Sequence, residues 1–176
     1  MVTPYLVLLL LIALERGVEL LISRRNAAAV RARGAKEAGR GHFPFMVAVH
    51  AAFLPACALE VLLLDRPFRP LLAGIMLALV VLAQVVRYLA VSALGDRWNV
   101  RVLVVPGEPP VRSGPYRYLR HPNYAAVLAE AFAIPLVHGA WLTAITFSIL
   151  NAVLLFGFRI PVEARALAAA ASDRPA

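Results

Sequence analysis

The chain of 176 residues alternates between long apolar segments and short polar stretches. A helix needs about 20 mostly apolar residues to cross the hydrocarbon core of a bilayer. By that measure the chain predicts membrane helices over residues 4–22, 43–64, 71–94, 125–137 and 140–158. We therefore expect an all-α fold, a polytopic membrane helix bundle with about five transmembrane helices.

The last two apolar segments are separated only by His138 and Gly139, which predicts a C-terminal helical hairpin. The first of these two segments is short for a full span, so it is expected to tilt or to end within the bilayer. Four membrane helices plus a re-entrant segment are the alternative to five. Pro161 lacks a backbone donor, so a kink or break is expected near Gly157.

Residues 95–123 are too polar to span a membrane and form a central loop in a single domain that covers residues 1–176. Within this loop, residues 101–105 are rich in β-branched side chains and predict a short extended segment. Several prolines and glycines follow this segment and indicate turns.

Composition agrees with a membrane protein. Hydrophobic residues make up 61% of the chain, against about 45–50% in ordinary soluble domains. The net charge is +8, but the basic residues lie between the apolar segments and form no polar stripe. Nucleic acid is therefore not expected as a partner, whereas membrane lipids are.

Two loops hold most of the basic residues and predict the orientation of the chain. These residues are Arg24, Arg25, Arg31, Arg33, Lys36 and Arg40 between the first two helices, and Arg97, Arg101, Arg112, Arg117 and Arg120 after the third. Cytoplasmic loops of membrane proteins carry an excess of lysine and arginine. Both loops and the C-terminus are therefore expected in the cytoplasm, with the N-terminus outside.

The only cysteine, Cys57, lies in an apolar segment, so it is interpreted as a small buried hydrophobic residue. No spacing of histidine and acidic residues resembles a zinc site, so no metal is expected.

Aromatic and basic side chains are concentrated in the stretch RSGPYRYLRHPNY, residues 112–124. Pro122 favours a first helical turn, so His121 is expected at the mouth of a helix, where free backbone N–H groups favour an anion. Nearby arginines add positive charge, and Tyr116 and Tyr124 offer flat rings. The pattern predicts a pocket for a ligand with a carboxylate and an aromatic base. A belt of tyrosine and arginine at the lipid headgroups is the alternative.

Downstream, Arg159 and Glu163 are four residues apart and share one helix face. A kink near Gly157 would turn both side chains inward over the central loop. The alternative is an ordinary surface ion pair, which contributes about 0.3–0.5 kcal/mol.

Several ionisable residues lie inside the apolar segments: Glu15, Arg16, Glu19, Glu60, Arg87 and Glu130. An isolated charge at the centre of a bilayer costs about 2.5–3.5 kcal/mol or more, so such residues pair or line a cavity. Arg87 is expected to pair with one of the glutamates. His42 and His50, at the start of the second helix, are placed to face the same cavity.

The segment GPYRYLRHPNY followed by RIPVEARAL closely resembles the isoprenylcysteine carboxyl methyltransferase family of small integral membrane enzymes. Gly114–Tyr116 and Arg120–Tyr124 match the first family segment, and Arg159 and Glu163 match the second. Ala164 stands where the family has a second acidic residue. Further residues resemble a bacterial branch of the family: ERGVEL at 15–20, Arg25-Asn26, RGAKEAG at 33–39, HFPFM at 42–46, Glu60, Leu94-Gly95 and Trp98-Asn99.

This resemblance implies an enzyme of the plasma membrane that uses S-adenosylmethionine and releases S-adenosylhomocysteine. It assigns the cofactor to Tyr116, Arg120, His121, Pro122 and Tyr124, and catalysis to Arg159 and Glu163. Arg159 is expected to orient the nucleophilic oxygen, and Glu163 to orient Arg159 or to accept a hydrogen bond from a ligand. His42, Glu60, Arg87 and Asn99 are assigned to the substrate pocket.

The resemblance also implies an O-methyltransferase whose lipophilic acceptor enters from the bilayer to a cytoplasmic active site. Alkylpyrones, alkylresorcinols and prenylcysteines are the expected classes of acceptor. Two other functions remain open: a phospholipid amine N-methyltransferase, and a transporter or scaffold without enzymatic activity. Binding of S-adenosylmethionine or S-adenosylhomocysteine separates the last of these from the two enzymes.

Overall fold

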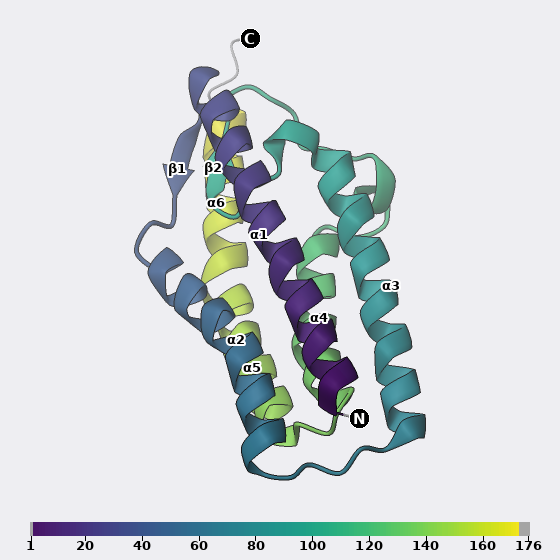
Figure 1. Cartoon of the computed structure of the whole chain (residues 1–176). Coiled ribbons are helices and arrows are strands. Elements are labelled where there is room, and N and C mark those ends of the chain that lie inside the picture. The colour runs from purple at the N-terminus through teal and green to yellow at the C-terminus, as the bar shows by residue number, and fades with distance from the viewer. Residues whose placement is uncertain (1, 173–176) are drawn as a thin grey trace.

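A computed structural model describes residues 2–172, and in that range five helical rods form the molecule (Figure 1). The rods are α1 (Val2–Ala32), α2 (Phe43–Leu63), α3 (Pro70–Leu94), α4 (Pro122–Leu136), and a last rod made of α5 (Trp141–Leu154), a π-helical turn (Leu155–Arg159) and α6 (Ile160–Ser172). The predicted all-α architecture and the helical hairpin are confirmed, and the predicted helix bounds lie within a few residues for α2, α3 and α4.

Three of the rods are long and apolar enough to cross a membrane: Phe43–Leu63, Pro70–Arg97 and Trp141–Ala170. They support an integral membrane protein. The prediction of about five transmembrane helices is therefore supported for three. Helix α1 has 31 residues but carries several charges, and α4 has only 15 residues, about 22 Å at 1.5 Å per residue.

Different connecting segments lie at the two ends of the bundle. The start of α1, the connection from α2 to α3 and the turn between α4 and α5 lie together at one end (Figure 1). The central loop, the end of α6 and a small sheet lie at the other. Both predicted basic loops therefore share one end of the molecule.

The small sheet pairs β1 (Lys36–Ala38) with β2 (Val102–Val104) in antiparallel register, with Glu37 opposite Leu103. The predicted extended segment at 101–105 is confirmed as β2. Just after β1, Gly39 has φ +70°, and a Cβ there would lie 2.3 Å from the His42 ring and 2.9 Å from Val162. Only glycine therefore lets the chain turn into α2 while packing against α6.

Helix α1 continues ten residues beyond its predicted end, and the extension holds the central loop in place. The Asn26 side chain donates hydrogen bonds to the carbonyl oxygens of Gly95 and Trp98, at 3.2 and 2.9 Å. Ser23 bonds to Asn99, with Oγ and Oδ1 3.0 Å apart, and its Oγ also accepts from the Val100 backbone N–H at 3.1 Å. These bonds fix β2 and the loop around it against α1.

The apolar core lies toward the end opposite the sheet and joins α1, α2, α3 and α4. Its members include Tyr5, Leu9, Cys57, Val80 and Ile134. Cys57 is fully buried, as the sequence predicted.

A kink or break was predicted near Gly157, and the break does not occur, because the helix continues through this point to Ser172. An irregularity does occur there, as a π-helical turn over Leu155–Arg159. Pro161 has no N–H to bond the carbonyl of Gly157 four residues earlier, and a π turn is one way to absorb the missing bond without ending the helix. Arg159 is the last residue of this turn.

Candidate active site

A cavity of about 780 Å³ lies between the helices and under the central loop. Every helical rod and strand β2 contribute to its walls. Apolar residues such as Val127, Ile134 and Leu155 line part of it, and polar residues at 116–124 and 159–163 line another part. The cavity therefore combines an apolar body with a polar region built from the two sequence motifs.

Tyr124 joins the two motifs. Its hydroxyl donates a hydrogen bond to Oε2 of Glu163 and accepts one from Nε of Arg159, at 3.0 Å. Arg159 is only 5% exposed and lines the cavity together with Tyr124 and Glu163. The pairing expected directly between Arg159 and Glu163 therefore runs through the Tyr124 hydroxyl.

His121 lies at the N-terminus of α4, as predicted. Its backbone carbonyl accepts from the N–H groups of Tyr124 and Ala125, both at 3.1 Å, and α4 begins at Pro122. The His121 ring stacks on the Tyr124 ring, with 5.3 Å between centroids and 16° between planes. Both rings line the cavity, whereas Pro122 is fully buried in the first turn and sets the start of the helix.

Tyr116 and Arg120 complete the predicted cofactor set. Tyr116 lies in a 3₁₀ turn over Gly114–Arg117 and lines the cavity, half-buried. Burial raises the pKa of its hydroxyl above the usual value, and the nearby Glu163 carboxylate raises it further, so the hydroxyl is neutral. Arg120 is exposed and lines the same cavity.

Arg87 is paired as predicted and also lines the cavity. Its Nε and Nη2 donate to the two carboxylate oxygens of Glu19, at 2.6 and 2.7 Å. Arg16 bonds Glu19 at 2.7 Å and Glu130 at 3.0 Å. Four ionisable residues from α1, α3 and α4 thus form one network inside the helix bundle.

Asn99 and His42 were both predicted for the substrate pocket, and the structure gives them different surroundings. Asn99 lines the cavity, but its amide bonds to Ser23 and to the Arg101 backbone N–H, so it positions the loop. His42 precedes α2 and stacks on Phe158, with 6.3 Å between ring centroids. Burial lowers the pKa of His42, and the charge of Arg159 lowers it further, which favours the neutral imidazole.

Glu60 lies at the opposite end of the bundle from the central loop. Its carboxylate accepts from the backbone N–H groups of Leu142 and Thr143, at 3.1 and 2.7 Å, in the first turn of α5. Arg66 donates to it from Nε at 2.9 Å. The structure therefore gives Glu60 the geometry of a helix cap, and does not bring it to the residues at 116–124.

Several residues that line the cavity were not predicted from the sequence as site residues. At the central loop, Arg97 pairs with Glu108 at 2.8 Å, and Arg101 pairs with Glu37 at 2.6 Å while its guanidinium lies 4.3 Å from the Phe43 ring centroid. Deeper along the helices, Asn151 also lines the cavity. Loop charges and a lone asparagine in an apolar helix gave no distinctive spacing that could have identified them.

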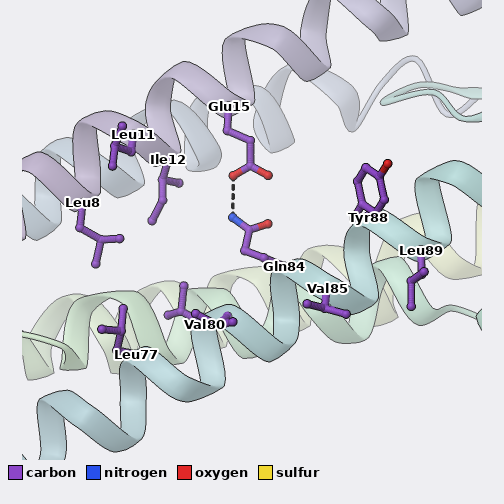
Figure 2. A pocket seen from close by; sticks show the side chains of 11 residues that line it. Leu8, Leu11, Ile12, Glu15, Leu77, Val80, Gln84, Val85, Tyr88 and Leu89 are labelled. Carbon is purple, nitrogen blue, oxygen red and sulfur yellow. Dashed lines mark hydrogen bonds between the residues drawn. The ribbon is translucent and has the colours of Figure 1, made fainter.

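A second, smaller groove of about 500 Å³ lies between α1 and α3 (Figure 2). Figure 2 shows its one polar contact, in which the Gln84 amide donates to Glu15 at 2.5 Å across the gap, among side chains such as Leu8, Leu77 and Val80. The groove shares only Ile12 with the main cavity's lining residues. Within residues 2–172, no three His, Cys, Asp or Glu side chains come together in a way that could hold a metal ion.

The sequence of the chain matches known proteins over most of its length. The Bacillus subtilis (strain 168) protein YpbQ, described as uncharacterized, is 40% identical over 160 residues, which cover 91% of this chain and 94% of that protein. An uncharacterized Haemophilus influenzae protein is 29% identical over 109 residues, 62% of this chain and 63% of its own length. The sequence model of the isoprenylcysteine carboxyl methyltransferase (ICMT) family matches residues 76–169, which include the whole Tyr124, Arg159 and Glu163 arrangement. The chain therefore belongs to the isoprenylcysteine carboxyl methyltransferase family.

Proposed function

We propose that this protein transfers a methyl group from S-adenosylmethionine to an oxygen of a lipophilic acceptor. Family membership implies a methyltransferase. The observation that carries the finer proposal is the joining of Arg159 and Glu163 by the Tyr124 hydroxyl on the wall of a largely apolar cavity.

The residues of the polar region fit the chemical groups of S-adenosylmethionine. Arg120 and the first turn of α4 offer positive charge to its carboxylate. The stacked rings of His121 and Tyr124 offer a flat surface to its adenine or its sulfonium. Asn123 lines the same cavity, and its buried Oδ1 finds no partner in the part of the chain that the structure describes. That oxygen is placed to accept a hydrogen bond from a ligand hydroxyl or ammonium.

When bound, S-adenosylmethionine supplies a methyl group on a positively charged sulfur. The chain's own residues position the acceptor oxygen for in-line attack on that methyl group. Arg159 orients the oxygen through its guanidinium, because its Nε is already held by Tyr124. Glu163 fixes Tyr124 from the other side. Positioning of this kind contributes about 7–11 kcal/mol in favourable cases, and an acceptor oxygen that is already anionic needs no base to remove a proton.

The nature of the acceptor follows from the walls of the cavity and from the arginine. Apolar side chains such as Val127 and Leu155 line the cavity between the helices and suit a hydrocarbon chain. A carboxylate or an acidic hydroxyl is already anionic near neutral pH and suits Arg159. Prenylcysteines and alkylpyrones with an acidic hydroxyl share both properties. An alkylresorcinol offers the same hydrocarbon chain, but its phenol is still protonated near neutral pH, so its methylation also requires a base. The charge of the two basic loops favours a cytoplasmic active site and C-terminus, with the N-terminus outside.

The test combines cofactor binding with methyl transfer on the purified protein in lipid nanodiscs. We expect S-adenosylhomocysteine to bind by calorimetry, and a radiolabelled methyl group to reach an alkylresorcinol or a prenylcysteine. Phosphatidylethanolamine, offered separately, tests an amine acceptor. The control is Arg117→Ala, which removes a basic side chain from the same exposed loop, outside the residues that line the cavity.

Failure to bind S-adenosylhomocysteine would overturn the proposal and favour a transporter or scaffold. Methylation of phosphatidylethanolamine alone would overturn the oxygen acceptor while keeping the methyltransferase. Labelling of an oxygen acceptor by the parent protein and by Arg117→Ala, but not by Glu163→Gln, would support it.

A further inference from the structure

The ionisable network inside the bundle is not fully satisfied by its own members. Besides the four residues described above, Glu15 lies 3.8 Å from Arg16 and adds a third carboxylate. The carboxylates of Glu15, Glu19 and Glu130 thus face two guanidiniums, those of Arg16 and Arg87. Arg87 is bonded to both oxygens of Glu19, and Arg16 is bonded to one oxygen each of Glu19 and Glu130. The network therefore contains more acceptor oxygens than its arginines are placed to bond.

Glu130 carries the unsatisfied oxygen. Its side chain is 7% exposed, and its Oε1 has no hydrogen-bond partner anywhere in residues 2–172. Its Oε2 bonds to Arg16 at 3.0 Å, and Arg87 stands 3.7 Å from the same atom. Leaving a buried acceptor unpaired is costly, so such groups in native proteins point to a missing partner.

Asn151 presents a second acceptor on the wall of the same cavity. It lies in α5, is 4% exposed, and its Oδ1 has no partner among the described residues. Glu130 and Asn151 come from the two helices that form the C-terminal hairpin, and both line the main cavity. Two unsatisfied acceptors among the residues that line the same cavity indicate a ligand that donates hydrogen bonds.

The neighbouring groove between α1 and α3 does not supply that donor. There the Gln84 amide is already bonded to Glu15 (Figure 2). Gln84 lines the groove and not the main cavity. The free acceptors therefore belong to the cavity in which the acceptor molecule of the proposed function would lie.

The two acceptors lie at a distance, along their helices, from Tyr124 and Arg159. Glu130 follows Tyr124 by six residues in α4, and Asn151 precedes Arg159 by eight residues in the last rod. At about 1.5 Å per residue these separations are roughly 9 and 12 Å along the helices. A ligand with its anionic head at Arg159 would therefore reach Glu130 and Asn151 with the middle of its chain.

We propose that Glu130 and Asn151 form a polar subsite that binds a hydrogen-bond donor, a hydroxyl or an amine, within the lipid chain of the acceptor. This inference rests on the proposed function, since it names a further property of the acceptor. The subsite selects chains with an internal polar group over purely hydrocarbon chains.

The test measures binding, so that it does not depend on turnover. Stearate and 10-hydroxystearate have the same head group and chain length and differ by one hydroxyl midway along the chain. Each displaces a fluorescent fatty acid from the full-length protein, with and without S-adenosylhomocysteine. We expect the protein to bind 10-hydroxystearate about tenfold more tightly than stearate, as one hydrogen bond to a buried charged acceptor allows.

Three variants assign the preference to the subsite. Glu130→Met removes both oxygens and leaves two carboxylates for two guanidiniums, so the remaining network stays balanced. Glu130→Gln and Asn151→Leu change one acceptor at a time. We expect Glu130→Met to bind both probes equally, and the other two variants to reduce the preference to about threefold. Ser148→Ala is the matched control, because it removes another unpartnered polar side chain of α5 that does not line the cavity, so the preference should stay unchanged.

Equal affinity of the parent protein for the two probes would overturn the subsite, as would an undiminished preference for 10-hydroxystearate in both Glu130→Gln and Asn151→Leu. If Glu130→Met does not fold, these two variants decide the outcome. A failed subsite with intact binding of S-adenosylhomocysteine leaves the methyltransferase proposal standing. A hydroxyl preference without binding of S-adenosylhomocysteine keeps the subsite and rejects the methyltransferase.

Discussion

The Tyr124 hydroxyl donates a hydrogen bond to the Glu163 carboxylate, although the two residues come from α4 and α6 and lie 39 positions apart. The same hydroxyl accepts from Arg159 at 3.0 Å. One phenol thus connects the two sequence motifs, and the geometry of the candidate catalytic groups depends on how α4 packs against the last rod.

Tyr124→Phe is expected to lower the rate of methyl transfer about 100-fold, because Arg159 loses the acceptor that fixes its Nε, and small errors of position carry penalties of that size. The stacked ring remains, so the affinity for S-adenosylhomocysteine should change little. Single-turnover kinetics and calorimetry on the same preparation measure the two effects. A large loss of cofactor affinity with an unchanged rate would show that the hydroxyl acts on the cofactor instead.

Glu163→Gln and Arg159→Ala are expected to abolish turnover while the protein still inserts and folds. Removing one preorganised electrostatic group costs about 100- to 1000-fold in rate. Arg159→Lys keeps the charge but loses the planar fork and the Nε bond to Tyr124, so it should recover little activity. Methyl-transfer assays normalised to folded protein check the series. Full activity in either Glu163→Gln or Arg159→Ala would remove that residue from catalysis.

His121→Ala is expected to weaken S-adenosylhomocysteine binding about tenfold, since the stacked partner of Tyr124 is lost. His121→Phe keeps a flat ring at the mouth of α4 and should retain most of the affinity. Calorimetric titration of both variants separates stacking from the charge and hydrogen bonds of the imidazole. A change confined to the affinity for the lipid acceptor would contradict our division of the cavity.

The helices, and several of the residues that line the candidate site, could be predicted from the sequence because they leave local patterns. Apolar length located α2 and α3, and the proline after His121 located the start of α4. The continuation of α1 to Ala32 was not predicted, because the apolar segment ends at residue 22 and the basic residues from Arg24 onward were assigned to a loop. Ser23 and Asn26 lie in this continuation. In the structure both are buried against the central loop, so their polarity serves long-range hydrogen bonds.

Contacts between distant segments explain the remaining differences. Spacing alone suggested a direct pair between Arg159 and Glu163, but Tyr124, 35 residues before Arg159, takes a hydrogen bond with each. Glu60 looked like a substrate ligand because it is a charge inside an apolar helix. Its partners Leu142 and Thr143 are more than 80 positions away, and only the packing of α2 on α5 brings them together.

The pH dependence of stability tests the interactions of Glu37, a residue of β1, with the arginines around it. Burial raises the pKa of Glu37, but the hydrogen bonds of Arg101 and Arg31 and the charges of Arg101 and Arg40 outweigh it and hold the pKa below its ordinary value of 4.5. A lowered pKa in the folded state means that the carboxylate stabilises the fold fully above that ordinary value. The contribution is lost as the pH falls through the lowered pKa.

Glu37→Gln should therefore lower the melting temperature at neutral pH by about 2–4 °C, as a loss of about 1 kcal/mol does in a chain of this size. The difference from the parent protein should stay constant down to a pH of about 5 and shrink below it. Differential scanning fluorimetry across this range measures it. A difference that grows as the pH falls would mean that folding raises the pKa of Glu37 and does not lower it.

Glu60→Gln separates a structural carboxylate from a catalytic one. Glu60 caps the first turn of α5 and pairs with Arg66 at 2.8 Å, so losing its charge should reduce stability by about 1–2 kcal/mol. The methyl-transfer rate per folded molecule should stay within about twofold of the parent, because no step of catalysis passes through this end of the bundle. Thermal unfolding and activity, measured on the same sample, give the two numbers. Lost turnover with unchanged stability would instead return Glu60 to the substrate pocket, where its place in an apolar segment first suggested it.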